Sequence, residues 1–181
     1  MSWLYLYLVV TLCLLHYNKN IGDYAAELNA MNFDEVLKNS PSTFAVVLFF
    51  VDFCRPCRNY KPQYEKVARL FNGADAVHPG IISVTKVDCA LQINAKLCAR
   101  FSVHYYPMLL WGLSSKFDSW EPDQVGDVRR IEARHTADAL LRWINLQIGT
   151  SFSLHDQNIE GGSFLTGTLS SWLRLQFNVI L

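Results

Sequence analysis

Short apolar runs and stretches of helical spacing alternate along this chain. Residues 44–51 form a continuous apolar run rich in Val and Phe, as expected of a strand covered on both faces. After residue 57, apolar side chains recur at helical spacing until Asn72-Gly73, which predicts an amphipathic helix. Pro62 lies inside this helix and removes one backbone hydrogen bond, so we expect a kink there.

Further elements follow the same alternation. Residues 81–87 and the apolar residues 108–111 predict two more strands, with a helix around residues 92–101 between them. The polar, turn-rich stretch 113–130 leaves room only for a weak edge strand in it or just after it. Strands that alternate with helices indicate an α/β domain whose sheet has crossover helices.

Capping signals predict two more helices. Asn32 is expected to be the N-cap of a helix near the start of the domain, with Glu35 three residues on as in a capping box. Thr136 is expected to cap a later helix that Gly149 stops.

The two ends of the chain differ from its middle. Residues 4–15 are almost wholly apolar but too few to span a bilayer comfortably, which is the layout of a secretory signal. A basic start and a clear cleavage site are missing, so an uncleaved signal anchor and a wrongly assigned translation start stay open. We therefore expect a signal peptide or signal anchor at 1–24, a compact domain at 25–149 and a poorly ordered tail at 150–181.

Charge balance and cysteine content narrow the class of protein. Lys and Arg number 16, as do Asp and Glu, and a net charge of zero argues against nucleic acid as a partner. Of the five cysteines, Cys13 is expected to leave with the signal. The other four can close as two disulfides in a secreted protein, and three pairings are formally possible. Spacing favours Cys54 with Cys57 and Cys89 with Cys98.

The sequence Cys54-Arg55-Pro56-Cys57 lies between the apolar run and the predicted helix, which indicates a redox-active pair. Free amide groups and the helix dipole at a helix N-terminus stabilise a thiolate, so Cys54 is the expected nucleophile. Cys57, one turn into the helix, is expected to be more buried and to resolve the mixed disulfide. Arg55 adds positive charge, from which we expect a reduction potential above that of thioredoxin.

Two plainer interpretations of this pair stay open. It could be half of a zinc knuckle, but zinc needs four ligands, and besides the other cysteines only His78 and His104 are nearby donors. It could also be a purely structural disulfide, although so small a ring gains little entropy.

The residues around the pair resemble a known family. Residues 49–57, 87–89 and 105–108 occur in the order and spacing of a thioredoxin-fold domain of the protein disulfide isomerase type. Residues 58–73 and 75–82 resemble, more specifically, the first thioredoxin domain of a plant quiescin-type sulfhydryl oxidase. The resemblance covers about residues 25–149 and implies a thioredoxin fold, in which helices flank a central mixed β-sheet.

The resemblance also implies roles for other residues. Pro107 is expected to be cis and to lie opposite the cysteine pair, where it forms a substrate groove with Tyr106. Cys89 and Cys98 are expected to form a stabilising disulfide, with a shuttle role as the alternative. Full-length members carry FAD in a helical module that these 181 residues lack, so the chain resembles a member truncated before that module. We expect no cofactor and no metal bound to this chain.

Two residues depart from the family pattern. Phe53 stands where these domains usually have tryptophan, which keeps an aromatic ring but loses the indole donor. Leu48 stands where the disulfide isomerase type carries a buried glutamate that relays the proton of the second thiol. Attack by Cys57 should therefore be slower, unless water or Asp52 takes the proton.

The expected function is a thiol-disulfide oxidoreductase that forms or exchanges disulfides in cysteine-containing proteins, with glutathione as a further thiol partner. The expected location is the endoplasmic reticulum or Golgi lumen, or the extracellular space, and the expected state is a monomer. Contact with a membrane is expected only if the N-terminal segment remains as an anchor. The alternative is a thioredoxin-fold binding module for unfolded clients whose cysteine pair is little used, which the loss of the carboxylate at Leu48 favours.

Overall fold

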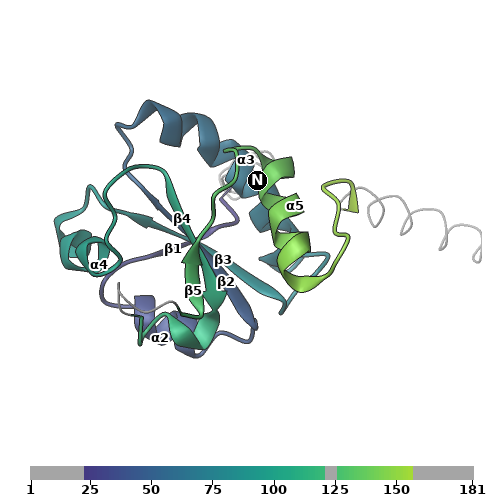
Figure 1. The fold of residues 1–181 in the computed structure, drawn as a ribbon, viewed down its shortest axis with the longest axis horizontal. Coiled ribbons are helices and arrows are strands. Elements are labelled where there is room, and N and C mark those ends of the chain that lie inside the picture. The colour runs from purple at the N-terminus through teal and green to yellow at the C-terminus, as the bar shows by residue number, and fades with distance from the viewer. Residues whose placement is uncertain (1–22, 121–125, 157–181) are drawn as a thin grey trace, which may run out of the picture.

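A five-stranded sheet in the order β1-β3-β2-β4-β5 forms the centre of the computed structural model, which describes residues 23–120 and 126–156 (Figure 1). β1, β3 and β2 run parallel, β4 runs antiparallel to β2, and β5 runs antiparallel to β4. The strands are β1 (Ala26–Leu28), β2 (Phe44–Phe50), β3 (Ile82–Asp88), β4 (Met108–Leu113) and β5 (Val128–Arg130). This mixed sheet confirms the expected fold class, and β5 confirms the weak edge strand.

Strand β2 is buried on both faces, as its unbroken apolar run predicted. Val46, Leu48 and Phe50 belong to one hydrophobic core cluster, while the alternating residues belong to a second cluster. Because successive side chains of a strand point to opposite faces, the two clusters cover the two sides of the sheet. β2 and the cysteine pair that follows it are therefore held from both sides.

Within the described residues, four α-helices cover these two faces (Figure 1). α3 and α5 supply Tyr64 and Leu140 to the cluster that contains Leu48. α2 and α4 supply Phe33 and Leu97 to the other. α3 continues through Pro62 as one helix, and the kink expected there stays a prediction. The helices are α2 (Phe33–Lys38), α3 (Arg55–Phe71), α4 (Ala95–Arg100) and α5 (Ala137–Ile148).

The capping predictions had different outcomes. Thr136 accepts a hydrogen bond from the backbone N–H of Ala139 at 3.2 Å, and Gly149 ends α5 at a φ of 68°, so both ends of α5 are confirmed. Asn32 is the N-cap residue of α2, as expected, but the predicted capping box was wrong because its side chain makes no hydrogen bond to the helix. The Oδ1 atom of Asn32 accepts instead from the backbone N–H of Asn29 at 2.8 Å, because the tight turn after β1 offers that donor first.

The packed part of the chain reaches further than residue 149. Phe152 and Leu154 pack against the core, and the side chain of Asn145 both donates to the carbonyl of Phe152 and accepts from its N–H. The side chain of Asn145 on α5 therefore holds the segment that follows the expected end of the domain. Of the expected signal and tail, residues 1–22 and 157–181 lie outside the described residues. Within the described part, no helix has the length and apolar character needed to cross a membrane.

Candidate active site

The Cys54–Cys57 disulfide lies where β2 passes into α3. Cys54 is the N-cap residue of α3, and its Sγ accepts a hydrogen bond from the backbone N–H of Cys57 at 3.2 Å. Pro56 fits the first turn because an N–H at that position would have no partner within the helix. The two Cα atoms are 5.2 Å apart. The structure thus confirms the predicted position of the pair at the start of the helix.

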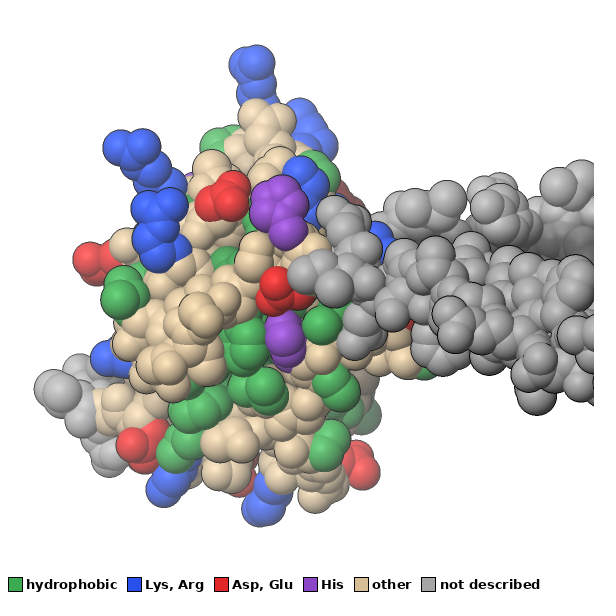
Figure 2. All heavy atoms as spheres, turned by 90° about the vertical axis from the view of Figure 1, so that its right-hand side faces the viewer, with side chains coloured by type: hydrophobic (Ala, Val, Ile, Leu, Met, Phe, Trp, Pro, Cys, Tyr) green, Lys and Arg blue, Asp and Glu red, His purple; other side chains and the backbone are tan. Residues whose placement is uncertain are grey.

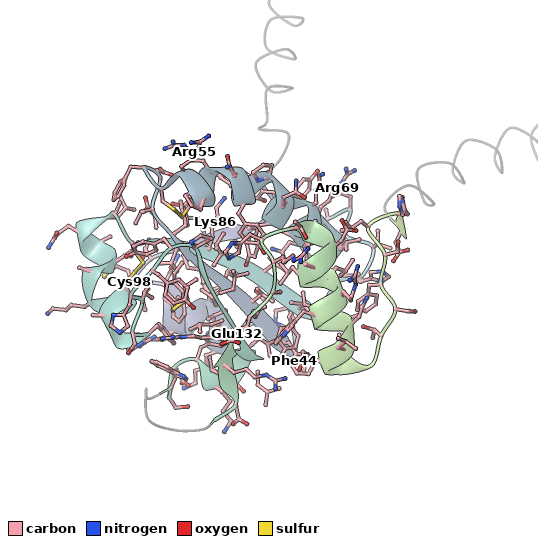
Figure 3. The ribbon with its side chains drawn as sticks, turned by 45° about the horizontal axis from the view of Figure 1, so that its top comes forward. Phe44, Arg55, Arg69, Lys86, Cys98 and Glu132 are labelled. Atoms are coloured by element: carbon pink, nitrogen blue, oxygen red, sulfur yellow. A yellow bond between two sulfur atoms is a disulfide. The ribbon has the colours of Figure 1, made fainter. Side chains whose placement is uncertain are left out.

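The two sulfur-bearing residues differ in exposure. Cys57 is 4% exposed and packs in the core, whereas Cys54 is half-buried. Phe53, the residue before the pair, is 77% exposed. Arg55 is also exposed and points away from the sheet (Figure 3). An incoming thiol therefore reaches Cys54 more easily than Cys57, which agrees with the roles predicted for them.

The Tyr106–Pro107 segment faces the cysteine pair. The peptide bond between these residues is cis, as expected, and Pro107 directly precedes β4. The carbonyl oxygen of Tyr106 lies 3.7 Å from the Sγ atom of Cys54. Fold topology thus brings together two segments more than fifty residues apart, and the backbone of Tyr106 is within reach of anything bound to Cys54.

Cys89 and Cys98 form the second disulfide, with Cα atoms 6.1 Å apart. Cys89 follows the end of β3 and donates its backbone N–H to the carbonyl of Phe50 at 2.8 Å. Cys98 lies on α4 and is buried. This disulfide joins the end of a central strand to a helix on the other face from α3, which supports the stabilising role.

Leu48 and Lys86 are direct partners in the register of β2 and β3. The strand position expected to hold a carboxylate thus carries an apolar side chain next to a buried ammonium group. Leu48, Cys57 and Lys86 line a small cavity below the cysteine pair, which has room for about one water molecule. Asp52 lines the same cavity. A water there can reach Cys57, as the proton route without a glutamate requires.

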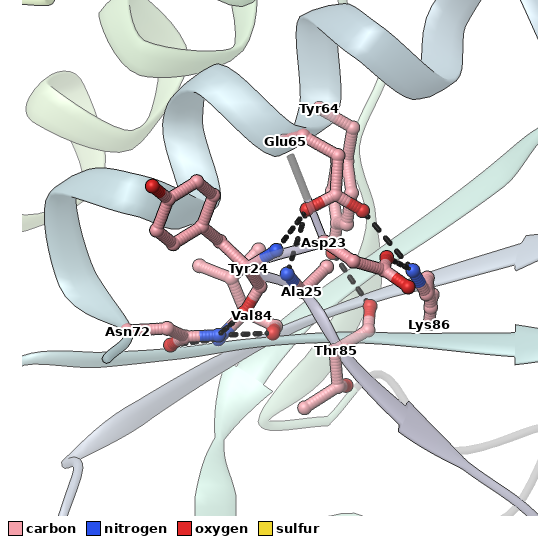
Figure 4. Close-up of polar contacts among 9 residues, drawn as sticks. All are labelled: Asp23, Tyr24, Ala25, Tyr64, Glu65, Asn72, Val84, Thr85 and Lys86. Atoms are coloured by element: carbon pink, nitrogen blue, oxygen red, sulfur yellow. Dashed lines mark hydrogen bonds and ion pairs between the residues drawn. The ribbon is translucent and has the colours of Figure 1, made fainter. Parts of the chain in front are cut away.

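The ammonium group of Lys86 pairs with carboxylates that come from outside strand β2 (Figure 4). Its side chain is 1% exposed and pairs with Glu65 of α3 at 3.1 Å and with Asp23. The other carboxylate oxygen of Glu65 accepts the backbone N–H groups of Tyr24 at 2.6 Å and Ala25 at 2.8 Å. The network joins α3, β3 and the segment before β1.

The network shifts the pKa values of Lys86 and Asp23. Burial alone lowers the pKa of the Lys86 ammonium, but the hydrogen bond to Asp23 and the charge and hydrogen bond of Glu65 outweigh burial, so the net pKa lies above the usual value. The hydrogen bond from Lys86 is the main cause that holds the pKa of Asp23 below its usual value. Lys86 is therefore a fixed cation under the active site at neutral pH.

Sequence reasoning missed this network. The available signal was a lysine inside a predicted strand, because a lysine that becomes buried must find a counter-charge. Its partners could not be named, since Glu65 and Asp23 lie 21 and 63 residues away in the sequence.

The two histidines considered as zinc ligands lie in different surroundings. The Nε2 atom of His78 lies 3.1 Å from an Asp156 carboxylate oxygen, and the ring packs on Phe152 with centroids 4.2 Å apart. His104 is exposed on the surface of the described domain. Among residues 23–120 and 126–156, no three His, Cys, Asp or Glu side chains gather as a metal site requires.

Comparison with known families agrees with this geometry. The family described as Thioredoxin matches residues 24–143, which include the cysteine pair, the cis-proline and most of α5. This chain belongs to the thioredoxin family.

Curated relatives within this family include plant sulfhydryl oxidases. The chain is 56% identical to sulfhydryl oxidase 2 of Arabidopsis thaliana over 141 residues, which are 76% of this chain and 28% of that protein. It is 53% identical to sulfhydryl oxidase 1 of Oryza sativa subsp. japonica, over 80% of this chain and 29% of that protein. The expected resemblance is confirmed, and the chain spans less than a third of these relatives' length.

Solved structures support the fold. Human ERp44 in a zinc-bound form superimposes with a TM-score of 0.53 at 21% identity, over 68% of this chain and 30% of that one. Full-length ERdj5 superimposes with a TM-score of 0.51 at 19% identity, over 67% of this chain and 16% of that one. At such identities the likeness concerns the fold alone.

Proposed function

We propose that this chain is a thiol-disulfide oxidoreductase that forms or exchanges disulfides in cysteine-containing proteins through Cys54 and Cys57. One observation carries the proposal: a half-exposed Cys54 at the N-terminus of α3 is disulfide-bonded to a buried Cys57 and faces the cis Tyr106–Pro107 bond. The family membership and the relatives that act on thiols support it.

The reaction follows from the different exposure of the two sulfurs. A client thiolate attacks Sγ of Cys54, the Cys54–Cys57 bond breaks, and Cys57 leaves as a thiolate that takes up one proton. A second client thiolate then attacks the client sulfur of the mixed disulfide and releases Cys54 as a thiolate. Two electrons pass from the client dithiol to the protein, and the reverse sequence donates them to an oxidised client or to glutathione disulfide.

The start of α3 stabilises the charge that develops on sulfur. The unpaired N–H groups and the helix dipole favour an anion at Cys54, and the N–H of Cys57 already points at that sulfur. The guanidinium of Arg55 adds a positive charge next to it. The same groups favour the reduced pair and make the disulfide the stronger oxidant.

The backbone of Tyr106 and Pro107 serves as the substrate groove. An extended client segment that places its sulfur on Cys54 lies beside the Tyr106 carbonyl, 3.7 Å away, and can pair with that backbone edge. Because such pairing uses main-chain groups, it does not require particular side chains in the client apart from the cysteine.

The FAD expected in full-length sulfhydryl oxidases is not expected to bind this chain, which covers 28% of one such relative. The cavity beside Cys57 has room for about one water molecule, so a flavin ring does not fit there. No step of the proposed reaction passes through FAD. Alone, the chain should oxidise clients stoichiometrically, or catalytically with glutathione, without oxygen uptake.

An oxidising compartment suits this chemistry. Two disulfides join residues of the domain, and such bonds persist in the secretory pathway and outside cells. We therefore propose the secretory lumen or the extracellular space as its location.

A binding module for unfolded clients is the second candidate, and it is favoured by Leu48 in place of a proton-relaying carboxylate and by the exposed Phe53. Cys54→Ser separates the two functions. If the pair acts chemically, oxidation of a reduced, unfolded client is lost in this variant. In Cys57→Ser, the Cys54 thiolate attacks a disulfide-bonded client and breaks its S–S bond, and the mixed disulfide accumulates because Cys57 is not there to release the client. If wild type and Cys54→Ser hold the client equally and neither oxidises it, the oxidoreductase proposal is wrong.

A further inference from the structure

The outer face of α3 carries several cations and, among its exposed side chains, no carboxylate. All five cations of α3 are exposed, including Lys66, and we call four of them, Arg55, Arg58, Lys61 and Arg69, the α3 cationic face. The acidic residue of the helix, Glu65, is buried and paired with Lys86. Figure 2 shows Lys and Arg side chains projecting from the upper edge of the molecule, where α3 lies.

This face begins at the redox pair. A helix rises about 1.5 Å per residue, so Arg58 and Lys61 lie about 4.5 and 9 Å beyond Arg55 along the axis, and Arg69 about 21 Å. At about 100° per residue the four positions fall within about 120° of the circumference. Arg55 and Arg69 both point away from the sheet in Figure 3. Cys54 is therefore at one end of a row of positive charge.

Helix stability does not explain the row. Cations in the first turn oppose the helix dipole, and the first turn of α3 has no acidic residue to offset them. Arg58 donates to the backbone carbonyl of Asp52 at 3.1 Å, and Arg69 lies over the ring of Tyr24 at 5.6 Å. These contacts orient two of the side chains without neutralising their charge. The chain as a whole is neutral, so the excess is local.

We propose that the α3 cationic face selects clients that carry Asp or Glu near the reacting cysteine. An extended peptide advances about 3.3 Å per residue, so acidic residues about two to four positions from the cysteine reach Arg58 and Lys61. Charges within about 8 Å still interact at physiological salt, so Lys61 acts on the encounter more strongly than the distant Arg69. The inference rests on the proposed function, because it names the substrate class of that reaction.

The test compares three peptides that share one two-cysteine core and differ only in its flanks, which are Asp/Glu, Asn/Gln or Lys/Arg. The full chain with an oxidised pair is mixed with each reduced peptide, and the second-order rate constant of peptide oxidation is measured. At about 20 mM salt we expect the acidic peptide to react about tenfold faster than the neutral one, and the basic peptide to react slowest. At about 500 mM salt the three rates should agree within about twofold.

Charge reversals locate the effect. Lys61→Glu should slow the acidic peptide about fivefold or more at low salt and leave the neutral peptide within about twofold. Arg69→Glu makes the same charge change on the same helix about 21 Å from Arg55 and should have a smaller effect. Lys96→Glu, on the exposed side of α4 across the sheet, is the matched control and should change neither rate.

The outcomes separate this inference from the proposed function. If wild type oxidises the neutral peptide but shows no order among the three, the inference is wrong and the oxidoreductase stands. It is also wrong if Lys61→Glu slows all three peptides alike, or if Lys96→Glu has the same effect as Lys61→Glu. If no peptide is oxidised, both proposals fall together.

Discussion

Removing the Lys86 ammonium should destabilise the protein strongly. Lys86→Met keeps most of the side-chain volume but leaves the carboxylate of Glu65, whose side chain is 7% exposed, without a cation. Breaking a buried pair in this way costs about 3–5 kcal/mol. Glu65 keeps the two N–H donors of Tyr24 and Ala25, and Asp23 is half exposed, so we place the loss at about 3 kcal/mol.

Urea unfolding at pH 7 measures this loss. With a slope of about 1.5–2 kcal/mol per molar urea for a domain of this size, the midpoint should fall by about 1.5–2 M. Lys38→Met is the matched control, because Lys38 pairs with Asp118 at 3.3 Å but is 66% exposed, and its loss should stay below about 1 kcal/mol. Adding Glu65→Gln to Lys86→Met removes the orphaned charge, so the double variant should lose less than the sum of the singles.

The raised pKa of Lys86 gives this test a pH dependence. A folded-state pKa above the unfolded value means that the contribution is complete below about pH 10.4 and is lost as the pH rises through the folded pKa. On the alkaline side, the difference in unfolding free energy between wild type and Lys86→Met should therefore persist up to about pH 10.4 and narrow above it. If Lys86→Met costs no more than Lys38→Met at pH 7, the network does not stabilise the fold and our account of it fails.

Three further predictions concern the active-site floor, the second disulfide and the β4–β5 edge. Leu48→Glu places a carboxylate beside Lys86, where it can take the proton of the Cys57 thiol, and should speed release of a client from its mixed disulfide by about tenfold or more. Quenched-flow mass spectrometry measures this rate. If Leu48→Gln speeds release equally, proton relay is not the cause. Replacing Cys89 and Cys98 together by Ser opens a loop with a sequence separation of 9 and should lower the free energy of unfolding in urea by about 2.5 kcal/mol, while client oxidation persists. If a folded variant no longer oxidises clients, this pair has a shuttle role. Gly112→Ala brings a Cβ to 2.6 Å from the carbonyl oxygen of Asp127 and should lower the free energy of unfolding by about 1–3 kcal/mol in the same measurement. An unchanged midpoint would mean that β5 moves away from β4 without cost.

Local signals predicted the parts of the fold that are local in origin. The apolar run of β2 ends within one residue of its prediction, and the expected stop at Asn72 is the C-cap of α3. Thr136 and Gly149 fixed the ends of α5 because capping depends on residues a few positions apart. The cysteine pair was located for the same reason, since its chemistry depends on one strand end and one helix start.

Contacts between distant segments account for what sequence reasoning missed. The cis bond at Pro107 was expected from the family resemblance and not from the residues alone. Asn32 failed as a side-chain cap because a neighbouring turn supplied another donor. Phe152 was assigned to the tail because neither its ring contact with Phe71 nor its hydrogen bonds to Asn145 leave a periodic pattern. Such contacts follow from how the sheet and helices assemble, which periodicity does not encode.

The central claim is that α3 holds the sulfur of Cys54 as a reactive anion. The most direct measurement is the rate of carbamidomethylation at this residue against pH, in protein whose Cys54–Cys57 bond has been reduced while Cys89–Cys98 stays closed. We predict that Cys54 reacts faster than free cysteine at pH 6 and that Cys57 reacts far more slowly, because it is 4% exposed. Equal rates for Cys54 and free cysteine from pH 5 to 8 would contradict the account.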